Sequence, residues 1–60
     1  MDKTVENIEE YERVDFNGKK LLITDIYKTF GESVEFISTD ENGKEFKFSK
    51  DWGATLTVLI

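Results

Sequence analysis

Hydrophobic and polar residues alternate along most of this 60-residue chain. From residue 11 onward the period is two, which is typical of strands that bury one face. Turn-forming residues interrupt the alternation at Asn17-Gly18 and at residues 30–32, 40–43 and 49–53. The pattern therefore predicts five strands, over residues 11–16, 19–27, 33–39, 44–49 and 55–60.

Two of the interruptions are typical hairpin turns. Asn-Gly readily supplies the positive φ angles that tight turns require, and it occurs at Asn17-Gly18 and Asn42-Gly43. A two-residue loop at the first of these sets three cross-strand pairs: Phe16–Lys19, Asp15–Lys20 and Val14–Leu21. All the loops are too short for parallel crossovers, so every pairing is expected to be antiparallel.

The side-chain pattern also predicts which residues form the core. One face of the strands carries the inward residues Phe16, Phe36, Phe46, Phe48 and Val58. The segment 19–27 is apolar on both faces, which indicates a central strand or a strongly bent one.

The first ten residues have a different pattern. Val5 and Ile8 are three positions apart and would share one face of a short helix over residues 2–10. Asp2 or Thr4 would cap this helix. Nine residues are too few for a stable isolated helix, so we expect it to dock through Val5 and Ile8.

The order of these elements resembles the SH3-like small β-barrel. The residues that carry the resemblance are the hairpin from Phe36 to Phe48 and the one-turn break at residues 49–53 before the last strand. The resemblance implies a single domain, with an acidic N-terminal helix over residues 1–10 and a five-stranded antiparallel barrel over 11–60. An OB-like barrel is the alternative, but it usually has a helix between strands three and four, where this chain has a four-residue turn.

Composition excludes several chemistries. The chain has no His and no Cys, which rules out disulfides, thiol nucleophiles, histidine-assisted catalysis and the usual zinc ligands. The spacing around Asp40–Lys44 does not match a calcium loop. The carboxylates of Glu9, Glu10 and Glu12 fit a solvated face of the predicted helix better than a catalytic or metal site. We therefore expect no enzymatic activity, no metal and no cofactor.

Charge is concentrated at the N-terminus. The whole chain carries 13 acidic and 8 basic side chains, for a net charge of −5. Residues 1–15 hold six acids and two bases, a net of −4, and the remaining residues are nearly balanced at −1. We expect this acidic segment to steer the protein toward a basic surface.

Several large apolar residues do not fit the predicted core. Trp52 lies in the break before the last strand, where it would close the barrel end or contact a partner. Tyr27 and Phe30 flank the loop at residues 30–32, and Leu22, Ile37 and Leu59 fall on the outward side of their strands. The candidate interaction surface therefore consists of Trp52, Tyr27, Phe30, Ile37 and Leu59.

These observations predict a small non-enzymatic protein-interaction module. It would dock on another protein, or on a second copy, through a strand edge or through its outward apolar residues. The small size, the acidic N-terminus and the lack of cysteine are similar to accessory proteins of prophages and mobile elements, which implies a host protein as partner. No signal peptide and no membrane-spanning stretch are recognised, so a cytoplasmic location is expected.

Two other functions remain open at this point. A nucleic-acid-binding barrel would use Lys44, Lys47 and Lys50 together with Trp52, although alternation places Lys47 on the face opposite Phe46 and Phe48. The second alternative is a structural subunit that acts only by assembling.

Overall fold

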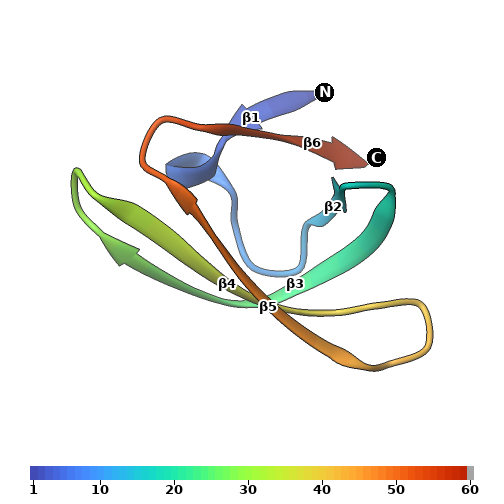
Figure 1. The fold of residues 1–60 in the computed structure, drawn as a ribbon. Coiled ribbons are helices and arrows are strands. Elements are labelled where there is room, and N and C mark those ends of the chain that lie inside the picture. The colour runs from blue at the N-terminus through green and yellow to red at the C-terminus, as the bar shows by residue number, and fades with distance from the viewer. Residues whose placement is uncertain (60) are drawn as a thin grey trace.

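The computed structural model describes residues 1–59, which form one antiparallel sheet of six strands (Figure 1). In sheet order the strands are β1-β6-β2-β3-β4-β5. Along the chain the elements are β1 (Asp2–Thr4), the 3-10 turn η1 (Val5–Asn7), β2 (Arg13–Phe16), β3 (Lys19–Thr29), β4 (Ser33–Thr39), β5 (Glu45–Asp51) and β6 (Thr55–Leu59).

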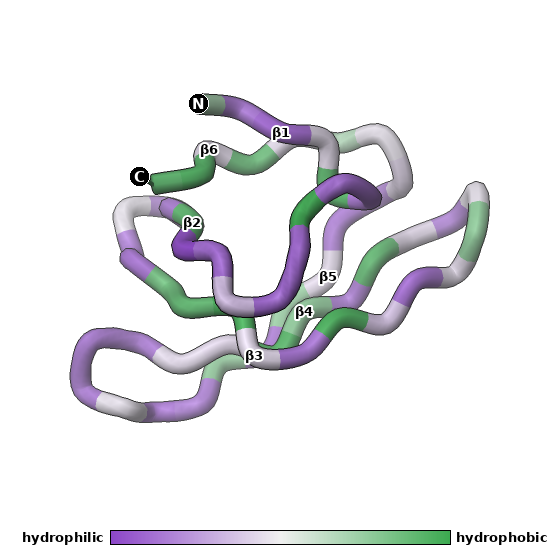
Figure 2. Tube along the Cα trace, turned by 180° about the vertical axis from the view of Figure 1, so that it is seen from behind, coloured by the Kyte–Doolittle hydropathy of each residue, from purple (hydrophilic) through white to green (hydrophobic). Residues whose placement is uncertain are grey.

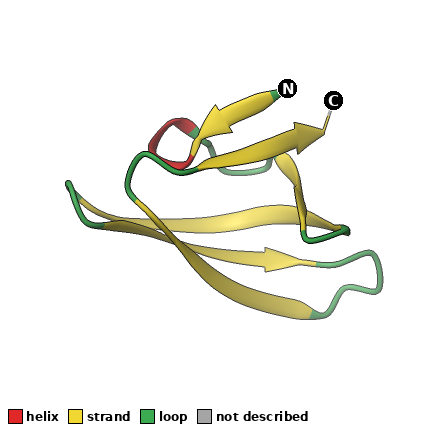
Figure 3. Cartoon of the chain, turned by 45° about the horizontal axis from the view of Figure 1, so that its top comes forward, coloured by secondary structure: helices red, strands yellow, loops and turns green. Residues whose placement is uncertain are grey.

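The antiparallel β architecture is confirmed, but the sheet is not closed. β1 and β5 are its two edges and are not hydrogen-bonded to each other. The sheet instead curls into two layers, with β1 and β6 above β3, β4 and β5, and with β2 connecting them (Figure 3). The barrel closure expected from the sequence is therefore not formed.

The core lies between these layers. Hydrophobic and hydrophilic residues alternate along the strands (Figure 2), and one face of the sheet turns inward. Phe36 and Val58 are buried as predicted, whereas Phe16, Phe46 and Phe48 are only half-buried against the core. The buried hydrophobic core consists of Val5, Ile8, Val14, Leu21, Ile23, Val34, Phe36, Leu56 and Val58.

The β2–β3 hairpin has the register predicted from its turn. Val14 pairs with Leu21, and the Asp15–Lys20 and Phe16–Lys19 pairs follow. Asn17 and Gly18 both have positive φ, of 52° and 86°. The Gly18 N–H donates to Asp15 Oδ1 over 2.9 Å, which fixes the turn locally.

A β-bulge explains why the β3 sequence is apolar on both faces. The register with β4 shifts between Ile23 and Asp25, which leaves Thr24 as the extra residue. Leu21 and Ile23 face the core before the bulge, and Ile26 packs against the core after it. Thr24 Oγ1 donates to the Ile37 carbonyl over 3.0 Å and so holds the bend.

The predicted helix over residues 2–10 is wrong. Residues 2–4 form β1, which pairs with β6, and the only helical residues in this segment are the three of η1. The Val5 N–H donates to the Ala54 carbonyl over 2.8 Å. A helix this short has little stability of its own, so pairing with the β6 edge replaces it. Val5 and Ile8 are nevertheless buried, as the spacing predicted.

The end of the chain differs from the prediction in detail. β5 continues to Asp51, so the break before β6 is confined to Trp52, Gly53 and Ala54. Leu56 and Val58 share the buried face as predicted, and the predicted inward position of Ile60 lies outside the described residues. Residues 1–59 contain no helix with the length and apolarity needed to cross a bilayer.

Candidate interaction surface

The longest unpaired edge of the sheet is β5, which is seven residues long. It pairs with β4 on one side only, and no other described strand is hydrogen-bonded to its second side. Glu45, Lys47, Ser49 and Asp51 are exposed, and the residues between them are half-buried. β5 thus has one face toward the core and one toward solvent, and its edge is open.

The hydrogen-bond alternation of the β4–β5 ladder shows which backbone groups face this open edge. The Asp40 N–H donates to the Lys44 carbonyl over 3.0 Å, and the Trp52 N–H donates to the Glu32 carbonyl over 2.9 Å. Bonded pairs alternate in an antiparallel ladder, so the even-numbered residues of β5 bond to β4. The N–H and C=O groups of Lys47 and Ser49 therefore point toward the open edge.

An aromatic cluster fills the space between β2 and the inner face of β5. We use this name for Phe16, Phe36, Phe46 and Phe48. The Phe16 and Phe48 ring centroids are 4.3 Å apart and stacked, and Phe48 stacks on Phe36 at 5.1 Å. These side chains therefore join β2 and β5, which are not neighbours in the sheet.

Two lysines lie against the half-buried rings of this cluster. Lys19 Nζ is 4.8 Å from the centroid of Phe46, and Lys50 Nζ is 5.4 Å from that of Phe16. Ammonium groups over aromatic faces contribute about 0.5–1 kcal/mol at exposed sites. Lys47 lies on the other face, 3.8 Å from Glu45, as alternation predicted. The inner side of β5 is therefore both aromatic and basic.

Trp52 and Phe30, two of the candidate residues, lie together. Their ring centroids are 5.0 Å apart at the end of the molecule where β3 turns into β4. Trp52 is half-buried against the core, while Phe30 is 88% exposed. The Gly53 N–H donates to Glu6 Oε1 over 3.0 Å, which ties this corner to the N-terminal segment. Trp52 thus covers one end of the core, and Phe30 extends that surface into solvent.

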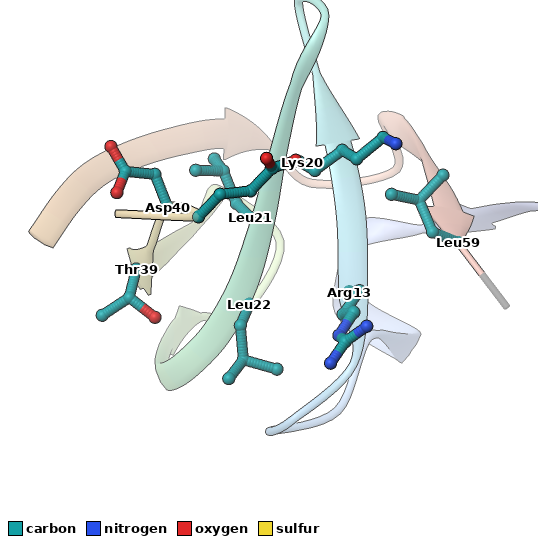
Figure 4. A pocket seen from close by; sticks show the side chains of 8 residues that line it. Arg13, Lys20, Leu21, Leu22, Thr39, Asp40 and Leu59 are labelled. Carbon is teal, nitrogen blue, oxygen red and sulfur yellow. The ribbon is translucent and has the colours of Figure 1, made fainter. Parts of the chain in front are cut away.

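The other candidate residues lie elsewhere. Tyr27 and Ile37 line a shallow hollow of about 370 Å³ on the outer face of β3, β4 and β5, together with Lys47. Leu59 lines a separate groove of about 650 Å³ (Figure 4). The five candidates are therefore distributed over three places and do not form one surface.

Arg13 lines the groove beside Leu59. Arg13 of β2 pairs with Leu22 of β3 on one side and with Leu59 of β6 on the other. The three side chains therefore lie in one row on the outer face of the sheet. The groove is also lined by Lys20, Leu21, Thr39, Asp40 and Glu41 (Figure 4). The groove offers both charged and apolar surface, and residues 1–59 show no cluster of acidic residues that could hold a metal ion.

Part of the N-terminal acidity has a structural role. Glu12 accepts from the Glu9 N–H over 2.8 Å and forms an ion pair with Lys3 at 3.1 Å. The backbone hydrogen bond from Glu9, followed by the Lys3 ammonium, lowers the pKa of Glu12 below its ordinary value despite partial desolvation. Glu9 and Glu10 are exposed, as expected for a solvated face, but Glu12 is not part of that face because it is half-buried by these contacts.

The sequence did not reveal the unusual backbone of Tyr11. Its φ is 69°, a conformation that side chains larger than Asn rarely adopt, and the ring is 73% exposed. The Tyr11 N–H donates to the Ile23 carbonyl over 2.7 Å, next to the bulge in β3. Strand-like alternation at residues 11–16 gave no signal for this turn.

No family model, no curated protein and no solved structure matches this chain.

Proposed function

We propose that this chain is a non-enzymatic protein-interaction module that binds by adding a partner strand to the open edge of β5. The observation that carries the proposal is the row of unpaired backbone groups at Lys47 and Ser49. Long open edges readily pair with extended segments of other chains, because backbone hydrogen bonds supply affinity and alternate side chains supply specificity.

β5 is better suited to this role than the other edge of the sheet. β1 is only three residues long, whereas β5 is seven. A strand added to β5 would also place alternate side chains over the half-buried rings of Phe46 and Phe48. Covering apolar surface contributes about 25 cal/mol per Å², which β1 with its sequence Asp-Lys-Thr does not offer.

We further propose that the fold is an opened SH3-like barrel. Support comes from the bulge at Thr24, which bends the second of the five predicted strands, and from the tight break at Trp52-Gly53 before the last strand. The free edge of β5 would then be the place where the barrel is left incomplete.

A proline at residue 49 tests the proposed function. The Ser49 N–H points away from β4, so Ser49→Pro leaves the β4–β5 hydrogen bonds in place and removes a donor from the open edge. Ser49→Ala keeps the donor and is the matched control. Both variants should retain the far-ultraviolet circular dichroism of the parent.

The partner is sought with tagged protein in an extract of the source cell. The expected result is a protein that binds the parent and Ser49→Ala but not Ser49→Pro, and whose binding slows amide exchange at Lys47 and Ser49. A partner that binds Ser49→Pro equally well, or that leaves both amides unchanged, would overturn the proposal.

A nucleic-acid-binding function is the second candidate, favoured by one observation. Lys19 and Lys50 lie against half-buried rings, and single strands bind to surfaces that combine cations with aromatic rings. The net charge of −5 opposes it. Fluorescence of Trp52 titrated with oligothymidylate decides: quenching that weakens with added salt supports this function, and no response up to high concentration contradicts it.

A further inference from the structure

We propose that the partner strand is β5 of a second copy, paired antiparallel about a twofold axis through Ser49. Two six-stranded sheets would then join into one continuous sheet. This inference rests on the proposed function and names its partner. It follows from the order of charges along β5, which is self-complementary in one register.

The register follows from symmetry and from the backbone groups that face the edge. With an axis through Ser49, Ser49 pairs with Ser49 of the second copy, and Lys47 pairs with Asp51 of the second copy. The backbone N–H and C=O groups of these residues all face the open edge. An axis midway between two residues would instead place an edge-facing residue opposite one that is bonded to β4. The axis must therefore pass through a residue.

Charge favours the axis through Ser49 over its neighbours. At Ser49, the symmetric arrangement makes two ion pairs between Lys47 and Asp51. An axis through Phe48 places Glu45 opposite Asp51 of the second copy, which brings two acidic side chains together. An axis through Lys47 or through Lys50 places that lysine opposite the same lysine of the second copy. Like charges directly across a strand pair are destabilising, so these registers are disfavoured. An axis through Phe46 pairs Glu45 with Lys47 but overlaps the two strands over only three residues.

Both charged side chains are available for this contact. Asp51 is exposed, and its carboxylate makes no hydrogen bond or ion pair with any of residues 1–59. Lys47 is close only to Glu45, at 3.8 Å, and the two side chains are 68% and 61% exposed. The Asp51 carbonyl accepts from the Ala54 N–H over 3.0 Å, and its second lone pair remains for the added strand.

The inner face is complementary in the same register. Phe48 lies opposite Lys50 of the second copy, and Phe46 lies opposite Trp52. Cross-strand pairs of an aromatic ring with a cation or another aromatic ring are favourable. The contact would therefore cover the half-buried rings on the inner face while it pairs the charges on the outer face.

A charge swap tests the register. We expect sedimentation equilibrium to show a concentration-dependent dimer of the parent. The twofold axis makes two Lys47–Asp51 ion pairs in each dimer. Lys47→Asp and Asp51→Lys each turn both ion pairs into like-charge contacts, and each should weaken dimerisation about 10-fold. The double variant restores opposite charges and should return to within about threefold of the parent. Glu41→Lys, an exposed turn residue, is the charge-matched control for Asp51→Lys and should leave the dimer unchanged.

The outcomes separate this inference from the proposed function. A monomer at all concentrations, or a double variant no better than the single variants, overturns the inference. If Ser49→Pro still abolishes capture of another protein, the proposed function stands without it. A dimer that is insensitive to Ser49→Pro forms elsewhere on the molecule and contradicts the strand-addition account as a whole.

Discussion

Phe16 of β2 stacks on Phe48 of β5, with ring centroids 4.3 Å apart, although the two strands are not neighbours in the sheet. The contact connects two parts of the sheet that the backbone leaves unpaired. Together with the buried core, it holds β2 against β5 in a sheet that is not closed. It also explains why the inner face of β5 is half-buried while its edge is free.

Loss of this stack should destabilise the fold. Phe16→Ala removes contacts with Phe46 and Phe48, and we expect the free energy of unfolding to fall by about 2–3 kcal/mol, below the value for a fully buried ring. Urea unfolding followed by Trp52 fluorescence measures the change. Phe30→Ala is the matched control, because that ring is 88% exposed and should cost less than about 1 kcal/mol. Equal losses from the two substitutions would contradict the role given to the stack.

The ion pair and hydrogen bond at Glu12 predict a specific acid sensitivity. The pKa of Glu12 is lower in the folded chain than its ordinary value, so ionised Glu12 stabilises the fold above that ordinary value. This stabilisation is lost as the pH falls through the lowered pKa. We therefore expect Glu12→Gln to be less stable than the parent at pH 7 and to lose less stability between pH 7 and pH 3.

Urea unfolding at several pH values checks this prediction. Glu10→Gln, at an exposed position of the same segment, is the control and should follow the parent. The account of Glu12 would be refuted by a parent and a Glu12→Gln variant with the same dependence on pH.

The backbone at Tyr11 predicts a stabilising substitution. A left-handed conformation costs a residue with a large side chain about 1–2 kcal/mol, and Asn tolerates it better. Tyr11→Asn should therefore raise the midpoint of urea unfolding. Tyr27→Asn makes the same change at an exposed strand position and should lower the midpoint, because Asn is unfavourable in strands. If both substitutions lower it equally, the left-handed turn at Tyr11 is not present in solution.

Local signals explain which parts of the fold were predictable. The β2–β3 register follows from Asn17-Gly18, since a two-residue turn fixes every pair beyond it. β4, over Ser33–Thr39, has the predicted bounds because its alternation is regular and turns flank it. The N-terminus was not predictable in this way, because the spacing of Val5 and Ile8 suits both a helix and the observed docking, and the choice depends on β6, some 50 residues away.

The candidate surface was less predictable because it depends on sheet order. The sequence predicts docking through a strand edge, but it does not indicate that β5 is an edge. The separation of Leu59 from Ile37 likewise follows from β2 and β3 lying between β6 and β4. By contrast, alternation alone predicts that Lys47 lies on the other face of its strand from Phe46 and Phe48, and this prediction is confirmed.

Residue-resolved amide exchange along β5 tests the central claim most directly. In dilute protein, the amides of Phe48 and Lys50, bonded to β4, should exchange slowly, and those of Lys47 and Ser49 should exchange fast. Raising the protein concentration should slow exchange at Lys47 and Ser49 as a second copy occupies the edge. Slow exchange at Lys47 and Ser49 in the most dilute sample would show that the edge is already closed within one chain, and would contradict the account.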